Sequence, residues 1–202
     1  QQILAPSANK LANQQNRQVN GGGVSNNQGV IGGAASAYTV RQSAAPRRLI
    51  YGRVKTGGVL VYPKKTPLDW HLHLAIYLGE GPIEGLTGPV YLGDRRSTDA
   101  QLSGLVARTV YTGAPGQAHS AALAAGSEGE WTSAMVGNGC AWVHTVYTFD
   151  RERWDMGPVM PAFEVLGRRC FDPRTGALTP GATSNPALVM LDFIRSEFGY
   201  AA

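Results

Sequence analysis

The stretch from Trp70 to Leu78 alternates apolar and other side chains more clearly than any other part of the chain. Because successive side chains of an extended strand point to opposite faces, one face would carry Trp70, Leu72, Leu74, Ile76 and Leu78. The other face would carry His71, His73, Ala75 and Tyr77. A helix needs apolar residues every three or four positions, so this pattern predicts a strand with its leucine-rich face in a core and its histidine face half exposed.

The rest of the chain favours short strands and turns. Gly and Pro make up 38 of the 202 residues (26 and 12), and this excess is typical of many turns rather than a helix bundle. Further strands are expected at residues 38–40, 48–55, 59–62, 90–92, 102–112, 140–149 and 162–171, with a short helix near 120–125. The fold class is therefore mainly β with a C-terminal helix (α+β), built from antiparallel hairpins.

Two turns can be predicted from the residue types that form them. Residues 48–62 alternate on both sides of Thr56-Gly-Gly58, which predicts a hairpin that turns at the glycine pair. Asp172-Pro-Arg-Thr-Gly176 predicts a turn, since Pro supplies a fixed φ and Gly a permissive one.

The last element predicted is a helix over residues 185–198. Ser184 or Asn185 would cap its start, Pro186 fits its first turn, and Gly199 is a good stop. Its apolar residues recur at helical spacing and are too numerous for a free helix, so we expect it to dock on the sheet.

The first 36 residues have a different composition. They contain twelve Gln or Asn, six Gly, two charged residues and no aromatic residue. Such a segment buries too little apolar surface to offset the entropy of ordering it. We therefore expect two parts: residues 1–36 as a low-complexity extended arm that orders only against other subunits, and residues 37–202 as the β-rich part.

The charges are also divided unequally. Residues 1–68 hold nine Lys or Arg and no Asp or Glu, which is +9, while the remainder holds nine basic and fourteen acidic residues, which is −5, so the total is +4. The asymmetry suggests nucleic acid, an acidic partner, or contact between copies of the same chain. Because no zinc-finger, RNP or helix-turn-helix pattern occurs, surface complementarity is favoured over sequence-specific nucleic-acid binding.

No arrangement typical of catalysis stands out. His71 and His73 lack a third ligand, and the cluster Asp150, Glu152 and Asp155 is better explained as a charged loop. Cys140 and Cys170 are expected to be two thiols, with a disulfide as the alternative. We expect no catalytic residue, cofactor, metal or nucleic-acid site, and no apolar run reaches the ~18 residues of a membrane span.

Four stretches, in order, resemble one family. They are APRRLIYGRVKTGG (45–58), LGEGPIEG with VYLGD (78–85 and 90–94), GRRCFDPRTG (167–176) and NPALVMLDFIRSEFGY (185–200). Together they resemble the central tail-hub, or host-specificity (tip attachment), proteins of lambda-like long-tailed bacteriophages and gene transfer agents. The motif residues that carry this resemblance are Pro46, Arg47, Arg48, Tyr51, Gly52, Arg53, Gly81, Pro82, Asp172, Pro173, Gly176, Asn185, Pro186 and Gly199.

The resemblance implies a structural virion protein of the tail tip, made in the host cytoplasm, and not an enzyme. It implies a ring or homotrimer at the end of the tail tube, with the tube, the distal tail protein, other tail-tip proteins and the tape-measure protein as partners. Family members are usually longer, so we expect an N-terminal portion of a larger hub or a split version. Candidates for assembly contacts are Arg41, Arg47, Arg48, Arg53 and Lys55.

Two other classes remain open from the residues alone. A β-rich secreted carbohydrate-binding module or hydrolase would use His71 and His73, or the Asp150–Asp155 cluster, in a concave pocket. A nucleic-acid-binding β-barrel would need its basic residues on one continuous face.

Overall fold

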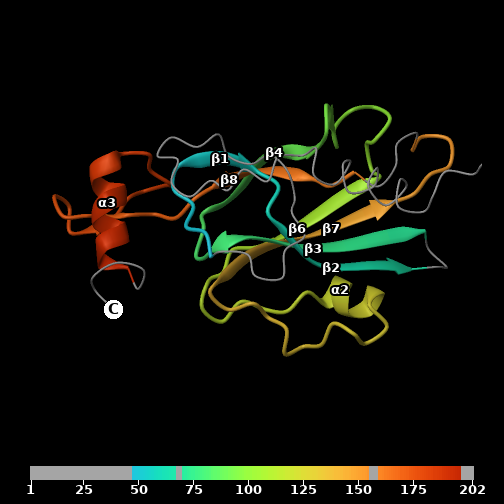
Figure 1. Cartoon of the computed structure of the whole chain (residues 1–202), viewed down its shortest axis with the longest axis horizontal. Helices are drawn as coiled ribbons and strands as arrows, with labels where there is room; N and C mark the ends of the chain where they lie inside the picture. The colour runs from blue at the N-terminus through green and yellow to red at the C-terminus, as the bar shows by residue number, and fades with distance from the viewer. Residues whose placement is uncertain (1–46, 67–69, 155–158, 197–202) are drawn as a thin grey trace, which may run out of the picture. The chain divides into compact units, whose positions relative to one another are not determined.

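A computed structural model describes residues 47–66, 70–154 and 159–196 (Figure 1). The expected arm at residues 1–36 and the short strand at 38–40 lie outside the described residues, as do Arg41, Pro46, Asp155 and Gly199. No helix in the described residues is long and apolar enough to cross a membrane.

Two four-stranded antiparallel sheets form most of the structure. The first has the strand order β2 (Val59–Thr66), β3 (His71–Glu80), β7 (Cys140–Thr148) and β6 (Val106–Tyr111). The second has the order β1 (Arg53–Thr56), β8 (Ala162–Leu166), β4 (Gly85–Leu92) and β5 (Arg95–Arg96). A small pair, β9 (Phe171–Asp172) with β10 (Ala177–Leu178), and the helices α2 (Ala121–Gly126) and α3 (Pro186–Arg195) complete it. The predicted class, mainly β with a C-terminal helix, is confirmed.

One apolar core joins the two sheets. From β3 it takes Leu74, Ile76 and Leu78, which are almost fully buried, as the alternation predicts. Val143 and Tyr147 of β7 lie in the same cluster, and so do Val90, Leu92, Phe163 and Val165 of the second sheet. The leucine-rich face of β3 therefore packs against the other sheet.

The opposite face of β3 is not half exposed, and that expectation is wrong for its central residues. Ala75 packs with Trp142 and with Leu123 of α2 in a second apolar cluster, and His73 is 7% exposed. Figure 1 shows α2 and its flanking loop beside β2 and β3. Ser120 caps α2 by accepting a hydrogen bond from the Leu123 N–H, which explains why a short helix starts there.

The predicted hairpin at residues 48–62 is also wrong, because β1 and β2 do not pair with each other. β1 pairs with β8, with Arg53 opposite Leu166, whereas β2 pairs with β3 in the other sheet. Gly58 has a φ of +71°, and a Cβ there would lie 2.4 Å from the Tyr77 carbonyl oxygen. The glycine pair thus ends β1, as expected, but carries the chain across β3 from one sheet to the other.

Trp70 departs from the alternation as well. It precedes β3, has a φ of +53° and is 60% exposed, so it does not share the buried face. Its carbonyl oxygen accepts a hydrogen bond from the Phe149 N–H (2.9 Å), which holds this turn against the end of β7.

Helix α3 begins as predicted. Asn185 is the cap, its side-chain oxygen accepting from the Ala187 N–H at 3.0 Å, and Pro186 is the first helical residue. The helix ends at Arg195, and the expected end at 198 lies outside the described residues. The sequence predicts that the helix docks on the sheet. The helix packs instead against the two-residue strand β9, and of its residues Leu188 alone is buried. Met190, Phe193 and Ile194 remain exposed.

Candidate functional site

The four motif stretches, far apart in sequence, meet in space. Their charged and tyrosine side chains form a cluster that we call the motif junction, made of Arg47, Tyr51, Tyr77, Glu80, Glu84, Arg168, Arg169 and Asp192. It joins the segment before β1, the end of β3, the β8–β9 connection and α3.

The first contact in the junction is made by the buried carboxylate of Glu80. The Arg47 guanidinium donates two hydrogen bonds to Glu80, both 2.6 Å, and the Tyr77 hydroxyl donates a third at 2.8 Å. The Glu80 side chain is 5% exposed, so it needs this compensation for lost water. Arg47 first, and then Tyr77, hold the pKa of Glu80 below its usual range. The APRR segment is thereby fixed to the EGPIEG segment.

Removing Arg47 tests this contact. We expect Arg47→Ala to lower the free energy of unfolding by roughly 1–2 kcal/mol, since a buried carboxylate loses its cation while the exposed guanidinium limits the effect. The neighbouring Arg48→Ala is the matched control, because the Arg48 side chain pairs with no carboxylate among the described residues, and we expect a loss under about 0.5 kcal/mol. Urea denaturation of both variants measures the difference, and equal losses would show that the pairing with Glu80 is irrelevant to stability.

Glu84 connects the second motif to the third and fourth. Its N–H donates to the carbonyl oxygens of Leu166 (3.1 Å) and Gly167 (3.0 Å). Its carboxylate accepts from the Ala182 N–H (2.5 Å) and lies 3.7 Å from the Arg169 guanidinium. This side chain therefore holds the loop that leads into α3.

Asp192 attaches the helix itself. It accepts a hydrogen bond from the Tyr51 hydroxyl (2.9 Å) and forms an ion pair with Arg168 (3.2 Å). Burial, followed by the hydrogen bond to Asp192, raises the pKa of Tyr51. Gly52 lies beside Ser184, and the Arg195 guanidinium lies 4.4 Å from the centre of the Phe171 ring. The first, third and fourth motifs thus meet at α3.

The remaining motif residues shape local turns. Between β9 and β10, Asp172 accepts from the Arg174 N–H (3.0 Å) and pairs with its guanidinium (2.7 Å), and Gly176 has a φ of +70°. This is the turn predicted at Asp172–Gly176, with Pro173 inside it. Gly81 and Pro82 are joined by a cis peptide bond, and a Cβ on Gly81 would lie 2.5 Å from Gly113 Cα.

The candidate assembly cations make contacts within the chain. Arg53 pairs with Glu164, and the Lys55 ammonium lies 3.8 Å from the centre of the Tyr91 ring. Arg48 contributes its carbonyl oxygen to the Glu80 N–H (2.7 Å). These residues therefore line the second sheet and the motif junction, and any contact with another subunit would use the exposed part of each cation.

His73, one of the two candidate histidines, belongs to a buried hydrogen-bonded chain of side chains. His73 Nδ1 lies 3.0 Å from Nε2 of His144, and Nδ1 of His144 lies 3.2 Å from Oγ of Ser120. Ser120 is fully buried and is the cap of α2, so its hydroxyl is closed to a substrate. The His71 ring lies edge-on to the His73 ring, with the ring centres 6.1 Å apart. Sequence reasoning missed His144, because it reaches His73 from 71 positions away, and it did not connect Ser120 to this pair.

In the acidic loop after β7, Asp150 and Arg153 form hydrogen bonds that hold the backbone. Asp150 accepts from the backbone N–H groups of Glu152 (2.9 Å) and Arg153 (3.2 Å), and the Arg153 guanidinium donates to the carbonyl oxygens of Ala100 and Ser103. Within residues 47–66, 70–154 and 159–196, no three His, Cys, Asp or Glu side chains are grouped to hold a metal ion. Cys140 and Cys170 are both free thiols, and burial raises the pKa of each.

Comparison with known proteins gives a structural match. The fold is similar to a chain in the virion of a native gene transfer agent (GTA) particle, with a TM-score of 0.52 and 22% sequence identity over 81% of this chain. The chain spans 39% of the length of that protein. No protein-family model and no curated protein sequence matches. At this identity the likeness establishes a shared fold.

Proposed function

We propose that this protein is a structural component of a phage or gene-transfer-agent virion, and specifically a central hub of the tail tip. In this role it assembles as a ring or homotrimer at the end of the tail tube. It connects the tube to the distal tail protein and other tail-tip proteins, and the tape-measure protein is a further partner. We also propose that it is not an enzyme.

The observation that carries the proposal is the fold shared with a chain of a GTA virion over 81% of the sequence. The motif junction supports the finer assignment. The four stretches that resemble tail hubs do not merely occur in order; their side chains bind one another through Glu80, Glu84 and Asp192. A set of motifs that builds one structural joint fits a protein whose task is to hold parts together.

Features of the surface fit an assembly part as well. The junction holds α3 so that Met190, Phe193 and Ile194 face outward, and apolar side chains exposed together on one helix are typical of contact surfaces. Two polar side chains in these regions have structural roles, since Ser120 caps α2 and Asp150 caps the turn after β7.

The experiment is the mass of the purified protein in solution. We expect native mass spectrometry to give a trimer or closed ring for the full chain at micromolar concentration. A variant without residues 1–36 should keep the β core folded but assemble more weakly, because that segment and the cations near it supply contacts to neighbouring subunits. A variant with residues 1–36 replaced by a Gly/Ser tract of equal length controls for chain length. A full chain that stays monomeric would contradict the hub.

A further inference from the structure

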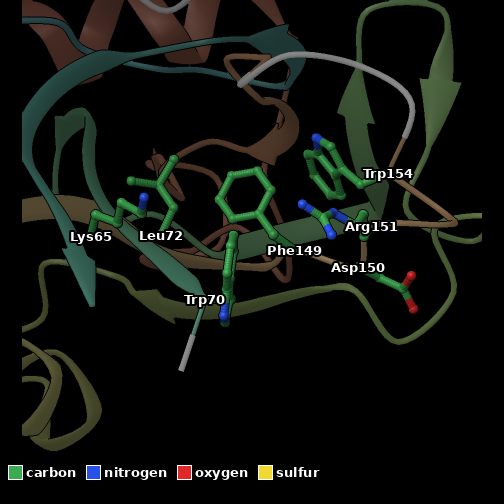
Figure 2. Close-up of a pocket in the computed structure, with 7 residues that line it drawn as sticks. All are labelled: Lys65, Trp70, Leu72, Phe149, Asp150, Arg151 and Trp154. Atoms are coloured by element: carbon green, nitrogen blue, oxygen red, sulfur yellow. The ribbon is translucent and has the colours of Figure 1, made fainter. Parts of the chain in front are cut away.

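A cavity of about 720 Å³ opens at one end of the first sheet, away from the motif junction residues. We call it the Trp70 pocket, and it is lined by Lys65, Trp70, Leu72, Phe149, Asp150, Arg151 and Trp154 (Figure 2). These residues come from the ends of β2, β3 and β7 and from the turn that follows β7. Its volume lies within the ~300–1,000 Å³ typical of small-ligand sites, which combine aromatic walls with a few polar groups.

The aromatic side chains of its wall pack against one another. The Phe149 ring meets the Trp154 ring edge to face with centres 5.2 Å apart, and Trp154 packs in turn on the buried Tyr147 at 5.3 Å. Figure 2 shows Phe149 between Leu72 on one side and Trp154 on the other. Side chains fixed in this way present a preformed surface, so a ligand would not have to order them.

Trp70 is the unusual member of this wall. It is 60% exposed, although a tryptophan gains more from burial than most residues, and its φ of +53° is costly for a bulky side chain. The hydrogen bond from the Phe149 N–H to its carbonyl oxygen keeps the backbone in this conformation. Core packing does not explain the cost, because the indole lies outside both apolar clusters. Strain of this kind is characteristic of binding sites.

Two cations, Lys65 and Arg151, flank the aromatic wall. The Lys65 ammonium lies 5.8 Å from the centre of the Trp70 ring, and neither it nor Arg151 forms an ion pair in the part of the chain that the structure describes. Figure 2 shows the Arg151 guanidinium turned towards Phe149 and Trp154, while the Asp150 carboxylate points away from the aromatic side chains. Asp150 instead caps the turn that places Arg151 and Trp154.

We propose that the Trp70 pocket binds a saccharide that carries an acidic group. The C–H face of a sugar ring is attracted to the negative face of an aromatic ring, which Trp70 and Phe149 supply. Lys65 and Arg151 donate hydrogen bonds to the hydroxyl groups and the carboxylate of the saccharide. The planar guanidinium of Arg151 is suited to pairing with a carboxylate through two hydrogen bonds. Nucleic acid is disfavoured, because the described lining residues include no neutral amide or hydroxyl side chain to read a base edge and include the carboxylate of Asp150. The site does not depend on the hub assignment.

The test titrates the full chain with a trisaccharide of galacturonic acid, with the matched neutral galactose trisaccharide, and with a nucleoside monophosphate. Tryptophan fluorescence and calorimetry give the affinities. We expect the acidic trisaccharide to bind with a Kd below about 1 mM and the neutral one more weakly. Trp70→Ala should weaken binding of both sugars by tenfold or more, and Trp70→Tyr should restore part of it.

The double variant Lys65→Gln/Arg151→Gln separates the two parts of the site. It should bring the affinity for the acidic trisaccharide down to that of the neutral one while leaving the neutral one nearly unchanged. Leu178→Ala removes an exposed apolar side chain on β10, outside the pocket, and should change neither affinity. The proposal is overturned if no saccharide binds at about 10 mM, if the nucleotide binds more tightly, or if Trp70→Ala binds as the parent does.

Discussion

Gly167→Ala is expected to destabilise the protein by roughly 3 kcal/mol, the upper end of the usual cost of overpacking. A Cβ at Gly167 would lie 2.2 Å from the Ile50 carbonyl oxygen and 2.6 Å from its carbon. Hydrogen bonds hold the two backbone segments together. The Gly167 N–H donates to the Gly52 carbonyl oxygen (2.7 Å), and the Arg168 N–H donates to the Ile50 carbonyl oxygen (2.9 Å). The methyl group would push the first motif away from the third, and urea denaturation measures the loss.

Gly181→Ala is the matched control for this substitution. Its φ lies outside the left-handed region, and the nearest atom to a Cβ there is Oε2 of Glu84 at 3.3 Å, the end of a flexible side chain. We expect a loss under about 1 kcal/mol. Equal effects of the two substitutions would mean that the close approach at Gly167 does not limit stability.

Acidification from pH 6.5 to pH 4 is expected to lower the free energy of unfolding by as much as about 3 kcal/mol through the buried histidine pair. His144 is 1% exposed, and burial, followed by the neighbouring His73, lowers its pKa from 6.5 to about 4. Burial also lowers the pKa of His73. Between these pH values the imidazole of His144 binds a proton in the unfolded chain but not in the folded chain. The free energy of unfolding therefore decreases as pH falls.

Comparison of variants isolates this effect from the carboxylates that also titrate near pH 4. His144→Asn removes the imidazole and should flatten the dependence of unfolding free energy on pH between 6.5 and 4, even if the variant is less stable throughout. His119→Asn, a substitution outside the histidine pair, controls for loss of an imidazole in general. If the parent and His144→Asn show the same slope, the buried pair does not govern the acid sensitivity.

The elements that follow from neighbouring residues were predictable. Period-2 alternation identified β3, the composition near residues 120–125 indicated the short helix α2, and Asn185-Pro186 marked the start of α3. The Pro and Gly of residues 172–176 specified their turn. In each case the physical cause is local, because a cap, a fixed φ or a face pattern acts within a few residues. The resemblance to tail hubs also identified Arg47 and Tyr51 in advance, but not their acidic partners.

Strand pairing and long-range side-chain contacts are determined only by the tertiary structure. The alternation in residues 48–62 fits a hairpin as well as two strands in separate sheets, and only pairing with Leu166 and Tyr77 distinguishes them. Tyr51 meets Asp192 across 141 residues, and Arg47 meets Glu80 across 33. The exposure of Trp70 and the burial of His73 likewise depend on elements that arrive from elsewhere in the chain. The sequence by itself determined strands, caps and turns, while partner choice and burial are set by long-range packing, whose free energy no local pattern contains.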